Sequence, residues 1–218
     1  MEKVWIKTKD GKEISGLYFR ADKPKGWVLY LHMMPATKES WMTLAGKMAS
    51  KGYSGIAVDL RGHGESSDGP DGYLKFSDSE HRSSINDVEA ADNFLQKRGD
   101  KNGKGTIIGA SIGANLALQY LSLHAEYKTG IFLSPGVDYR GVETTPFALK
   151  VPVEDEVLFV SSEDDLENPR QVTEIISRLP GEVYKDKIIY KTAGHGTNML
   201  ETKESPNLLN AIIGFVER

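Results

Sequence analysis

Short apolar runs alternate with amphipathic stretches along most of the 218 residues. A nearly continuous apolar run indicates a strand that is buried on both faces, and apolar residues at i, i+3, i+4 and i+7 indicate a helix. The apolar runs predict strands at residues 26–31, 54–60, 106–109, 130–133, 156–160 and 187–190. The helical rhythm predicts helices at 40–51, 85 to about 98, 112–123, after Pro169 to 179, and 208–216.

Two further strands are predicted near the N-terminus. Val4–Thr8 and Ile14–Arg20 flank the polar segment 9–12, and this pattern indicates a β-hairpin. Strands and helices alternate after the hairpin, an order typical of a mostly parallel sheet with helices on both faces. The sequence therefore predicts an α/β fold with an eight-stranded sheet and an N-terminal hairpin.

The composition is even along the chain, with no internal repeat and no segment that reads as a linker. We therefore expect one domain over residues 1–218. The single long irregular stretch runs from Arg61 to about Glu80 and contains four glycines. A stretch of this length is typical of a loop or flap over a functional site.

Composition and charge exclude several classes of protein. The net charge of −4 gives no reason to expect nucleic acid or an anionic membrane as partner. No cysteine is present, which excludes disulfides, cysteine nucleophiles and thiolate metal sites. No spacing typical of a metal or nucleotide site occurs, so we expect no metal and no cofactor. No signal peptide and no apolar run of membrane-spanning length is visible, and the expected location is cytoplasmic.

The segment Gly109-Ala110-Ser111-Ile112-Gly113 lies where a predicted strand turns into a predicted helix. Gly-x-Ser-x-Gly in this context indicates a nucleophilic serine on a strained turn. Glycine is expected on both sides because a side chain there would collide with neighbouring backbone. The helix that follows directs backbone N–H groups towards the serine. Ser111 is therefore the candidate nucleophile.

A serine hydroxyl needs a base, and the base needs an orienting acid. Among five histidines, His195 fits best, because it follows the last predicted strand and lies between two glycines. The acid is expected after the strand at 156–160, where Glu163, Asp164 and Asp165 are adjacent. Asp138, after the preceding strand, is a more distant alternative. The spacing alone leaves these carboxylates open.

Taken together, these segments resemble the α/β-hydrolase superfamily over nearly the whole chain. The resemblance rests on Leu31-His32 through Trp41, Asp59 through Ser66, Gly109 through Ala114, Asp165 with Pro169, and Gly194-His195-Gly196. It implies Ser111 as nucleophile, His195 as base and Asp165 as acid, in the chain order of this fold. The family often has glycine three residues before the acid, and this chain has Ser162 there.

The resemblance also implies an oxyanion hole made by the backbone N–H groups of Ile112 and Met34. The family usually has His-Gly-x in the loop after the first parallel strand, whereas this chain reads His32-Met33-Met34. Met33 and His32 are expected to line the pocket. His63 is expected to hold a loop beside the site.

The implied activity is that of a serine hydrolase acting on a small-molecule carboxylic ester. Large caps in this superfamily usually lie between the strands near 130 and 157, but here that interval is short. We therefore expect no large cap, an open site, and esters of short to medium acyl chain. A thioesterase or an aminopeptidase-like amidase would use the same triad. The alternative from another class is a non-catalytic binding protein on a hydrolase scaffold.

Overall fold

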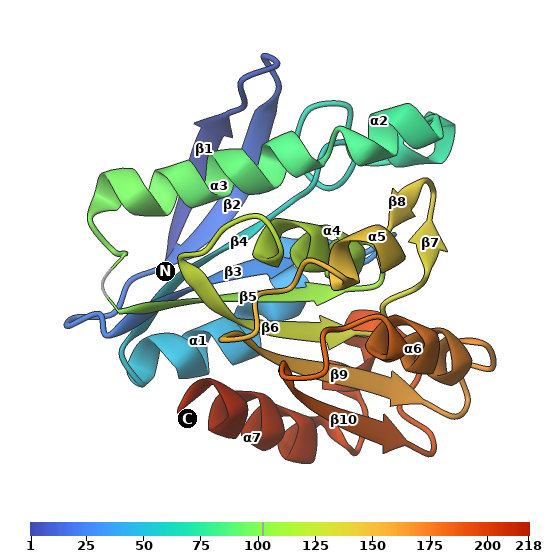
Figure 1. Ribbon diagram of the computed structural model, residues 1–218. Helices are drawn as coiled ribbons and strands as arrows, with labels where there is room; N and C mark the ends of the chain where they lie inside the picture. The colour runs from blue at the N-terminus through green and yellow to red at the C-terminus, as the bar shows by residue number, and fades with distance from the viewer. Residues whose placement is uncertain (102) are drawn as a thin grey trace.

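The computed structural model of the chain describes residues 1–101 and 103–218. An eight-stranded sheet crosses the molecule (Figure 1), in the spatial order β1-β2-β4-β3-β5-β6-β9-β10. Its strands are β1 (Glu2–Lys7), β2 (Glu13–Phe19), β3 (Gly26–Leu31), β4 (Tyr53–Val58), β5 (Lys104–Ala110), β6 (Tyr127–Leu133), β9 (Glu156–Ser162) and β10 (Tyr184–Tyr190). A separate small hairpin consists of β7 (Asp138–Tyr139) and β8 (Val142–Glu143).

The strand directions confirm the predicted fold class. The pairs β1–β2 and β2–β4 are antiparallel, and every pair from β4 to β10 is parallel. All six residues of β3 are buried, as are all six of β4. Parallel strands covered on both faces need apolar residues at every position, which explains why these strands read as continuous apolar runs.

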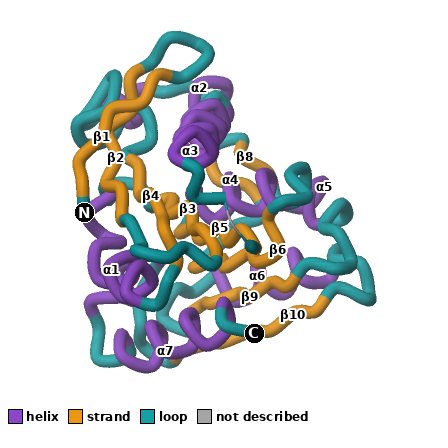
Figure 2. Tube along the Cα trace, turned by 90° about the vertical axis from the view of Figure 1, so that its left-hand side faces the viewer, coloured by secondary structure: helices purple, strands orange, loops and turns teal. Residues whose placement is uncertain are grey.

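Helices cover both faces of the sheet (Figures 1 and 2). Leu29 and Leu31 pack towards α3, α4 and α6, whereas Val28 and Tyr30 pack towards α1 and α7. Among the described residues, no helix has the length and apolar character needed to cross a bilayer. The α-helices are α1 (Met42–Ser50), α2 (Asp78–Arg82), α3 (Ile85–Arg98), α4 (Ile112–Leu121), α5 (Thr145–Ala148), α6 (Asn168–Ser177) and α7 (Ser205–Val216).

The structure differs from the predicted elements mainly where elements are short. The predicted helix 40–51 is preceded by a 3-10 turn at Lys38–Trp41, and the irregular stretch 61–80 contains a second one at Gly72–Lys75. The interval 134–155 holds β7, β8 and α5, which are too short to show a hydrophobic period. The edge strand β10 begins at Tyr184, earlier than predicted, because half-exposed polar residues interrupt its apolar pattern.

Glycine is required where α4 crosses the sheet. A Cβ atom on Gly113 would lie 2.4 Å from the carbonyl oxygen of Leu31 and 2.5 Å from that of His32. Gly214 also lies in a helix, but a Cβ atom there would meet nothing within 4 Å. The two glycines therefore form a matched pair for mutagenesis.

We expect Gly113→Ala to lower the free energy of unfolding by about 1–3 kcal/mol, because the added methyl group forces backbone apart. Gly214→Ala should instead raise it by about 0.5–1 kcal/mol, since alanine is the better helix former. Urea unfolding followed by circular dichroism measures both. Equal effects of the two substitutions would contradict the close packing at Gly113.

Candidate active site

Ser111 occupies the turn between β5 and α4 in a strained backbone conformation, with φ 53° and ψ −122°. Its N–H donates to the carbonyl of Leu133 at 2.8 Å, and its own carbonyl accepts from the N–H of Ala114 at 2.9 Å. A Cβ atom on Gly109 would lie 2.2 Å from the carbonyl oxygen of Gly113. The glycines thus have the steric role that the sequence predicts for a nucleophile turn.

His195 and Asp165 are joined directly, although they are 30 residues apart in the chain. The imidazole Nδ1 lies 2.5 Å from Oδ2 of Asp165, and both side chains are half-buried. With the proton on Nδ1, the ring donates to the carboxylate, and Nε2 remains free to accept a proton. The structure therefore brings the predicted base and the predicted acid together.

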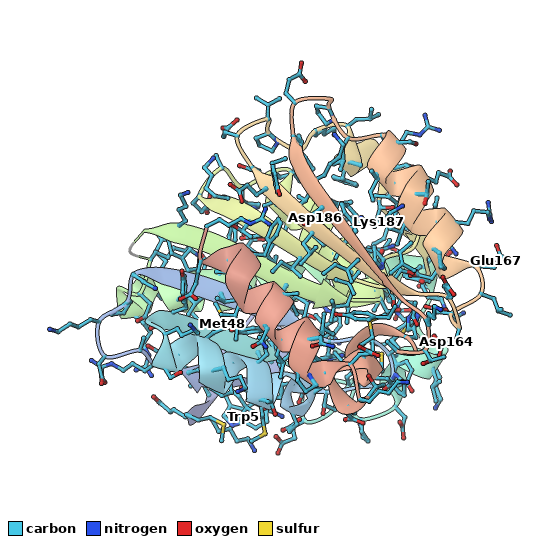
Figure 3. The ribbon with its side chains drawn as sticks, turned by 90° about the horizontal axis from the view of Figure 1, so that it is seen from below. Trp5, Met48, Asp164, Glu167, Asp186 and Lys187 are labelled. Carbon is cyan, nitrogen blue, oxygen red and sulfur yellow. The ribbon has the colours of Figure 1, made fainter. Side chains whose placement is uncertain are left out.

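The two neighbouring carboxylates take other positions. Glu163 is exposed, and Asp164 lies at the edge of the molecule near Glu167 (Figure 3). Asp164 accepts hydrogen bonds from the hydroxyl of Ser162 and from the N–H of Gly194. Of the three consecutive carboxylates, Asp165 is the one that contacts the imidazole.

Ser111 and His195 both contact Tyr139. The Ser111 side chain is hydrogen-bonded to Tyr139, and the ring of Tyr139 lies edge-on to that of His195, with centroids 6.2 Å apart. In the part of the chain described, the side chains of Ser111 and His195 are not hydrogen-bonded to each other. Contacts between catalytic groups often tighten only when substrate binds.

Burial raises the pKa of Tyr139, and the charge of Asp165 raises it further, although hydrogen bonds with Asn168 and Ser111 oppose these effects. The phenol therefore stays protonated at neutral pH and can donate a hydrogen bond. No sequence signal marks this residue, because β7 has only two residues.

The β7–β8 hairpin that carries Tyr139 is fixed to α4. The side-chain amide of Asn115 donates to the carbonyl of Val142 at 2.6 Å, and that of Gln119 donates to the carbonyl of Glu143 at 2.7 Å. The same helix begins directly after Ser111. Tyr139 and Ser111 are therefore held by one rigid element.

The predicted oxyanion donors are free of other partners. Among the described residues, the backbone N–H groups of Ile112 and Met34 donate to no acceptor. Ile112 is the first residue of α4, where N–H groups lack intrahelical acceptors. An oxyanion hole requires free donors beside the nucleophile. The N–H of Ile112 directly follows Ser111, and the role of both donors stays a prediction.

His32 and Met33, which we expect to line the pocket, are both buried, and their place in the pocket stays a prediction. His32 is fully buried; its Nε2 accepts from the N–H of Leu60 at 2.9 Å, and its Nδ1 donates to the carbonyl of Met33 at 2.8 Å. Met33 is buried under Gly196, where an added Cβ atom would lie 2.6 Å from the Met33 sulfur. Both residues support loops of the site from beneath.

Buried ion pairs hold the segment that begins at Arg61. Arg61 pairs with the fully buried Asp87, with 2.7 Å between the guanidinium and a carboxylate oxygen. The almost fully buried ammonium group of Lys38 pairs with Asp59 at 2.7 Å. His63 is buried and stacks on Tyr73 with centroids 4.2 Å apart. These contacts fix the loop beside the site, and His63 lies in it as a structural side chain.

The described residues contain no group of three histidine, aspartate or glutamate side chains that could hold a metal ion.

Ser162 has a position in the site that the sequence did not reveal. It is fully buried, and its hydroxyl contacts both Asp164 and the loop of His195. The sequence signal for this role was the serine at a position where the superfamily pattern often has glycine.

A family model described as serine aminopeptidase, S33, matches residues 22–154, which is more than half of the chain and includes Ser111. The chain belongs to this family of α/β-hydrolases. The match identifies the protein as a hydrolase. No curated protein sequence matches this hydrolase.

Solved structures share the fold of this hydrolase at low sequence identity. The esterase Pf2001 of Pyrococcus furiosus superposes with a TM-score of 0.80 at 18% identity, covering 100% of this chain and 90% of the esterase. The acylaminoacyl peptidase of Pyrococcus horikoshii gives 0.80 at 19% identity, covering 100% of this chain and 41% of the peptidase. Dienelactone hydrolase from Anabaena variabilis gives 0.77 at 15% identity, covering 98% and 95% of the two chains.

The buried His32 makes the stability of this hydrolase depend on pH. Burial, with a smaller contribution from His63, lowers the pKa of His32 to about 3. Between pH 6.5 and pH 3, His32 therefore binds a proton in the unfolded state but not in the folded state. Stability present above pH 6.5 is lost as the pH falls towards 3, at about 1.4 kcal/mol per pH unit.

We expect His32→Gln to flatten the pH dependence of the unfolding free energy, by up to about 2.7 kcal/mol between pH 6.5 and 4.5. Urea unfolding at several pH values measures this slope independently of the overall stability of the variant. His124→Gln is the control, because His124 is partly exposed and its removal should leave the slope unchanged. An unchanged slope in His32→Gln would contradict the prediction.

Proposed function

We propose that this protein is a serine hydrolase that cleaves carboxylic esters of short to medium acyl chain through Ser111, His195 and Asp165. The observation that carries the proposal is the direct hydrogen bond from His195 to Asp165. It lies at the sheet edge where Ser111 sits on its strained turn. A base held by an acid beside a nucleophile turn is the arrangement that acyl transfer requires.

The reaction follows from this geometry. The Ser111 hydroxyl gives its proton to Nε2 of His195 as its oxygen bonds to the ester carbonyl carbon. The N–H groups of Ile112 and Met34 donate hydrogen bonds to the carbonyl oxygen as its negative charge develops, and each such bond is commonly worth roughly 3–4 kcal/mol. Asp165 stabilises the imidazolium.

The tetrahedral intermediate then breaks its bond to the alcohol oxygen, which takes the proton from Nε2 and leaves. Water attacks the resulting acyl-enzyme and gives its proton to the same nitrogen. Collapse of the second intermediate releases the carboxylic acid and returns the proton to the oxygen of Ser111. The chemistry needs no cofactor and no metal.

The short interval between β6 and β9 supports small ester substrates. It holds only β7, β8 and α5, which is little chain to cover the site. An open site binds short acyl chains without enclosing long ones. The partner we propose is a small-molecule ester.

Thioesters and aminoacyl amides are the other substrates that the same triad serves. The family description favours the amide, since it names a serine aminopeptidase. The ester remains the proposal because an ester carbonyl is more reactive towards a serine nucleophile than an amide carbonyl. A parallel screen of matched esters, thioesters and aminoacyl amides decides among them by the ratio of kcat/KM values.

The decisive test is replacement of the nucleophile. We expect Ser111→Ala to lower kcat on a short activated ester by a factor of about 10⁴ or more, and to abolish labelling by a fluorophosphonate probe. Ser122→Ala is the matched control, because Ser122 caps the C-terminal end of the same helix and its hydroxyl donates to the carbonyl of Gln119 there. Wild-type turnover in Ser111→Ala would contradict the mechanism. An unlabelled wild-type protein would favour a non-catalytic binding role.

Acyl-chain length tests the open site. Each methylene that stays in water gains none of the roughly 0.8 kcal/mol available from burial. We therefore expect kcat/KM to level off or fall beyond about eight carbons in a series of matched esters. Strongest activity beyond about twelve carbons would require an enclosed acyl channel and would contradict the proposal.

A further inference from the structure

The loop that carries His195 has a glycine on each side of the histidine, so its backbone conformation depends on contacts with the rest of the protein. Gly194 and Gly196 flank the histidine with φ of 74° and 56°, in a region of backbone conformation that favours glycine. Glycine-rich backbone has many accessible conformations, so a fixed imidazole needs contacts from outside the loop. These contacts come from side chains at the ends of two neighbouring strands.

On the N-terminal side, two polar side chains receive the loop backbone. The N–H of Ala193 donates to Oγ of the fully buried Ser162 at 2.8 Å. The Ser162 hydroxyl donates in turn to Oδ1 of Asp164, and the N–H of Gly194 donates to the same oxygen at 3.1 Å. One serine and one carboxylate thus hold two successive peptide groups just before His195.

On the C-terminal side, the N–H of Gly196 donates to the hydroxyl of Ser134 at 2.9 Å. Ser134 is fully buried directly after β6. The carbonyl of His195 also accepts from the N–H of Asn198 at 3.2 Å. The backbone is therefore fixed before and after the histidine, and the position of the ring follows from these contacts.

We propose that Ser162 and Asp164 are positioning residues that place the His195 imidazole between Asp165 and Ser111 by holding the backbone of Ala193 and Gly194. The inference rests on the proposed function and deepens it. It explains two features that the triad leaves unused: a serine where the superfamily pattern often has glycine, and a second aspartate beside the acid. Asp164 acts as an acceptor for the loop, and Asp165 acts on the ring.

The hydrogen bonds also keep Asp164 ionised. The hydrogen bond from Ser162 is the main cause that lowers its pKa, and backbone N–H groups of the loop add to the effect. The contacts themselves use a single oxygen, Oδ1. An asparagine at this position retains an acceptor in the same place, because its side-chain oxygen can receive both donors. Asparagine and alanine at position 164 therefore separate the acceptor from the charge.

The experiment compares Ser162→Ala, Asp164→Ala, Asp164→Asn and the control Glu163→Ala in the full-length protein. Glu163 is exposed in the same acidic run, and its carboxylate contacts no described residue. Two readouts are used: kcat and KM on a short activated ester, and hydrogen–deuterium exchange of the segment 191–200. The second readout reports the loop whether or not the protein turns the ester over.

We expect Ser162→Ala and Asp164→Ala to lower kcat about 100-fold with KM nearly unchanged, since misplacement by about 1 Å costs this much. Exchange in 191–200 should accelerate in the same two variants. Asp164→Asn should keep kcat within a few-fold of the wild type, with slow exchange. Glu163→Ala should match the wild type in both measurements.

Two results would overturn the inference. Wild-type exchange and kcat in Asp164→Ala would show that the loop is held without this residue. Equal damage from Asp164→Asn and Asp164→Ala, with activity retained in Asp165→Asn, would make Asp164 the acid itself. Failure of the proposed function looks different: the wild type would be inactive on every ester, while exchange in 191–200 would still respond to Ser162→Ala.

Discussion

The close approach of α4 to the sheet is the constraint on which the site depends. Neither Gly109 nor Gly113 has room for a methyl group, because the chain turns from β5 into α4 within the three residues between them. That turn holds Ser111 at φ 53° and leaves the first N–H groups of the helix without acceptors. A steric condition of packing thereby places the candidate nucleophile directly before free backbone donors.

The rest of the site is brought to this fixed point from distant parts of the chain. Asp165 follows β9, His195 follows β10 and Tyr139 lies in the hairpin after β6. Parallel strands end at a common edge, so residues far apart in sequence become neighbours. The sheet alone gives only approximate proximity, and hydrogen bonds from loop N–H groups to the hydroxyls of buried serines give the finer placement.

Sequence reasoning found the features that depend on local sterics and on hydrophobic period. The fold class and the serine turn are of this kind. The pairing of His195 with an acid after β9 was predictable because parallel strands end at a common edge. The spacing alone left Glu163, Asp164 and Asp165 open, because adjacent residues differ only in the direction of their side chains. The resemblance to the superfamily selected Asp165, which is the one that contacts the imidazole. Sequence reasoning did not reveal that His32 and Met33 are buried, since a residue after a strand end can turn inward as well as outward. Tyr139 was not predicted as a site residue, because a strand of two residues shows no hydrophobic period.

The β7–β8 hairpin has a consequence for the evolution and engineering of lids. Its second strand is secured by Asn115 and Gln119 of α4, and its tip turns at Arg140 and Gly141, both with positive φ. Chain added at the tip would leave the anchoring bonds and the sheet register in place. The hairpin therefore offers a graft point at which a minimal rim could grow into a full covering domain, changing which molecules reach the serine without rebuilding the machinery beneath it.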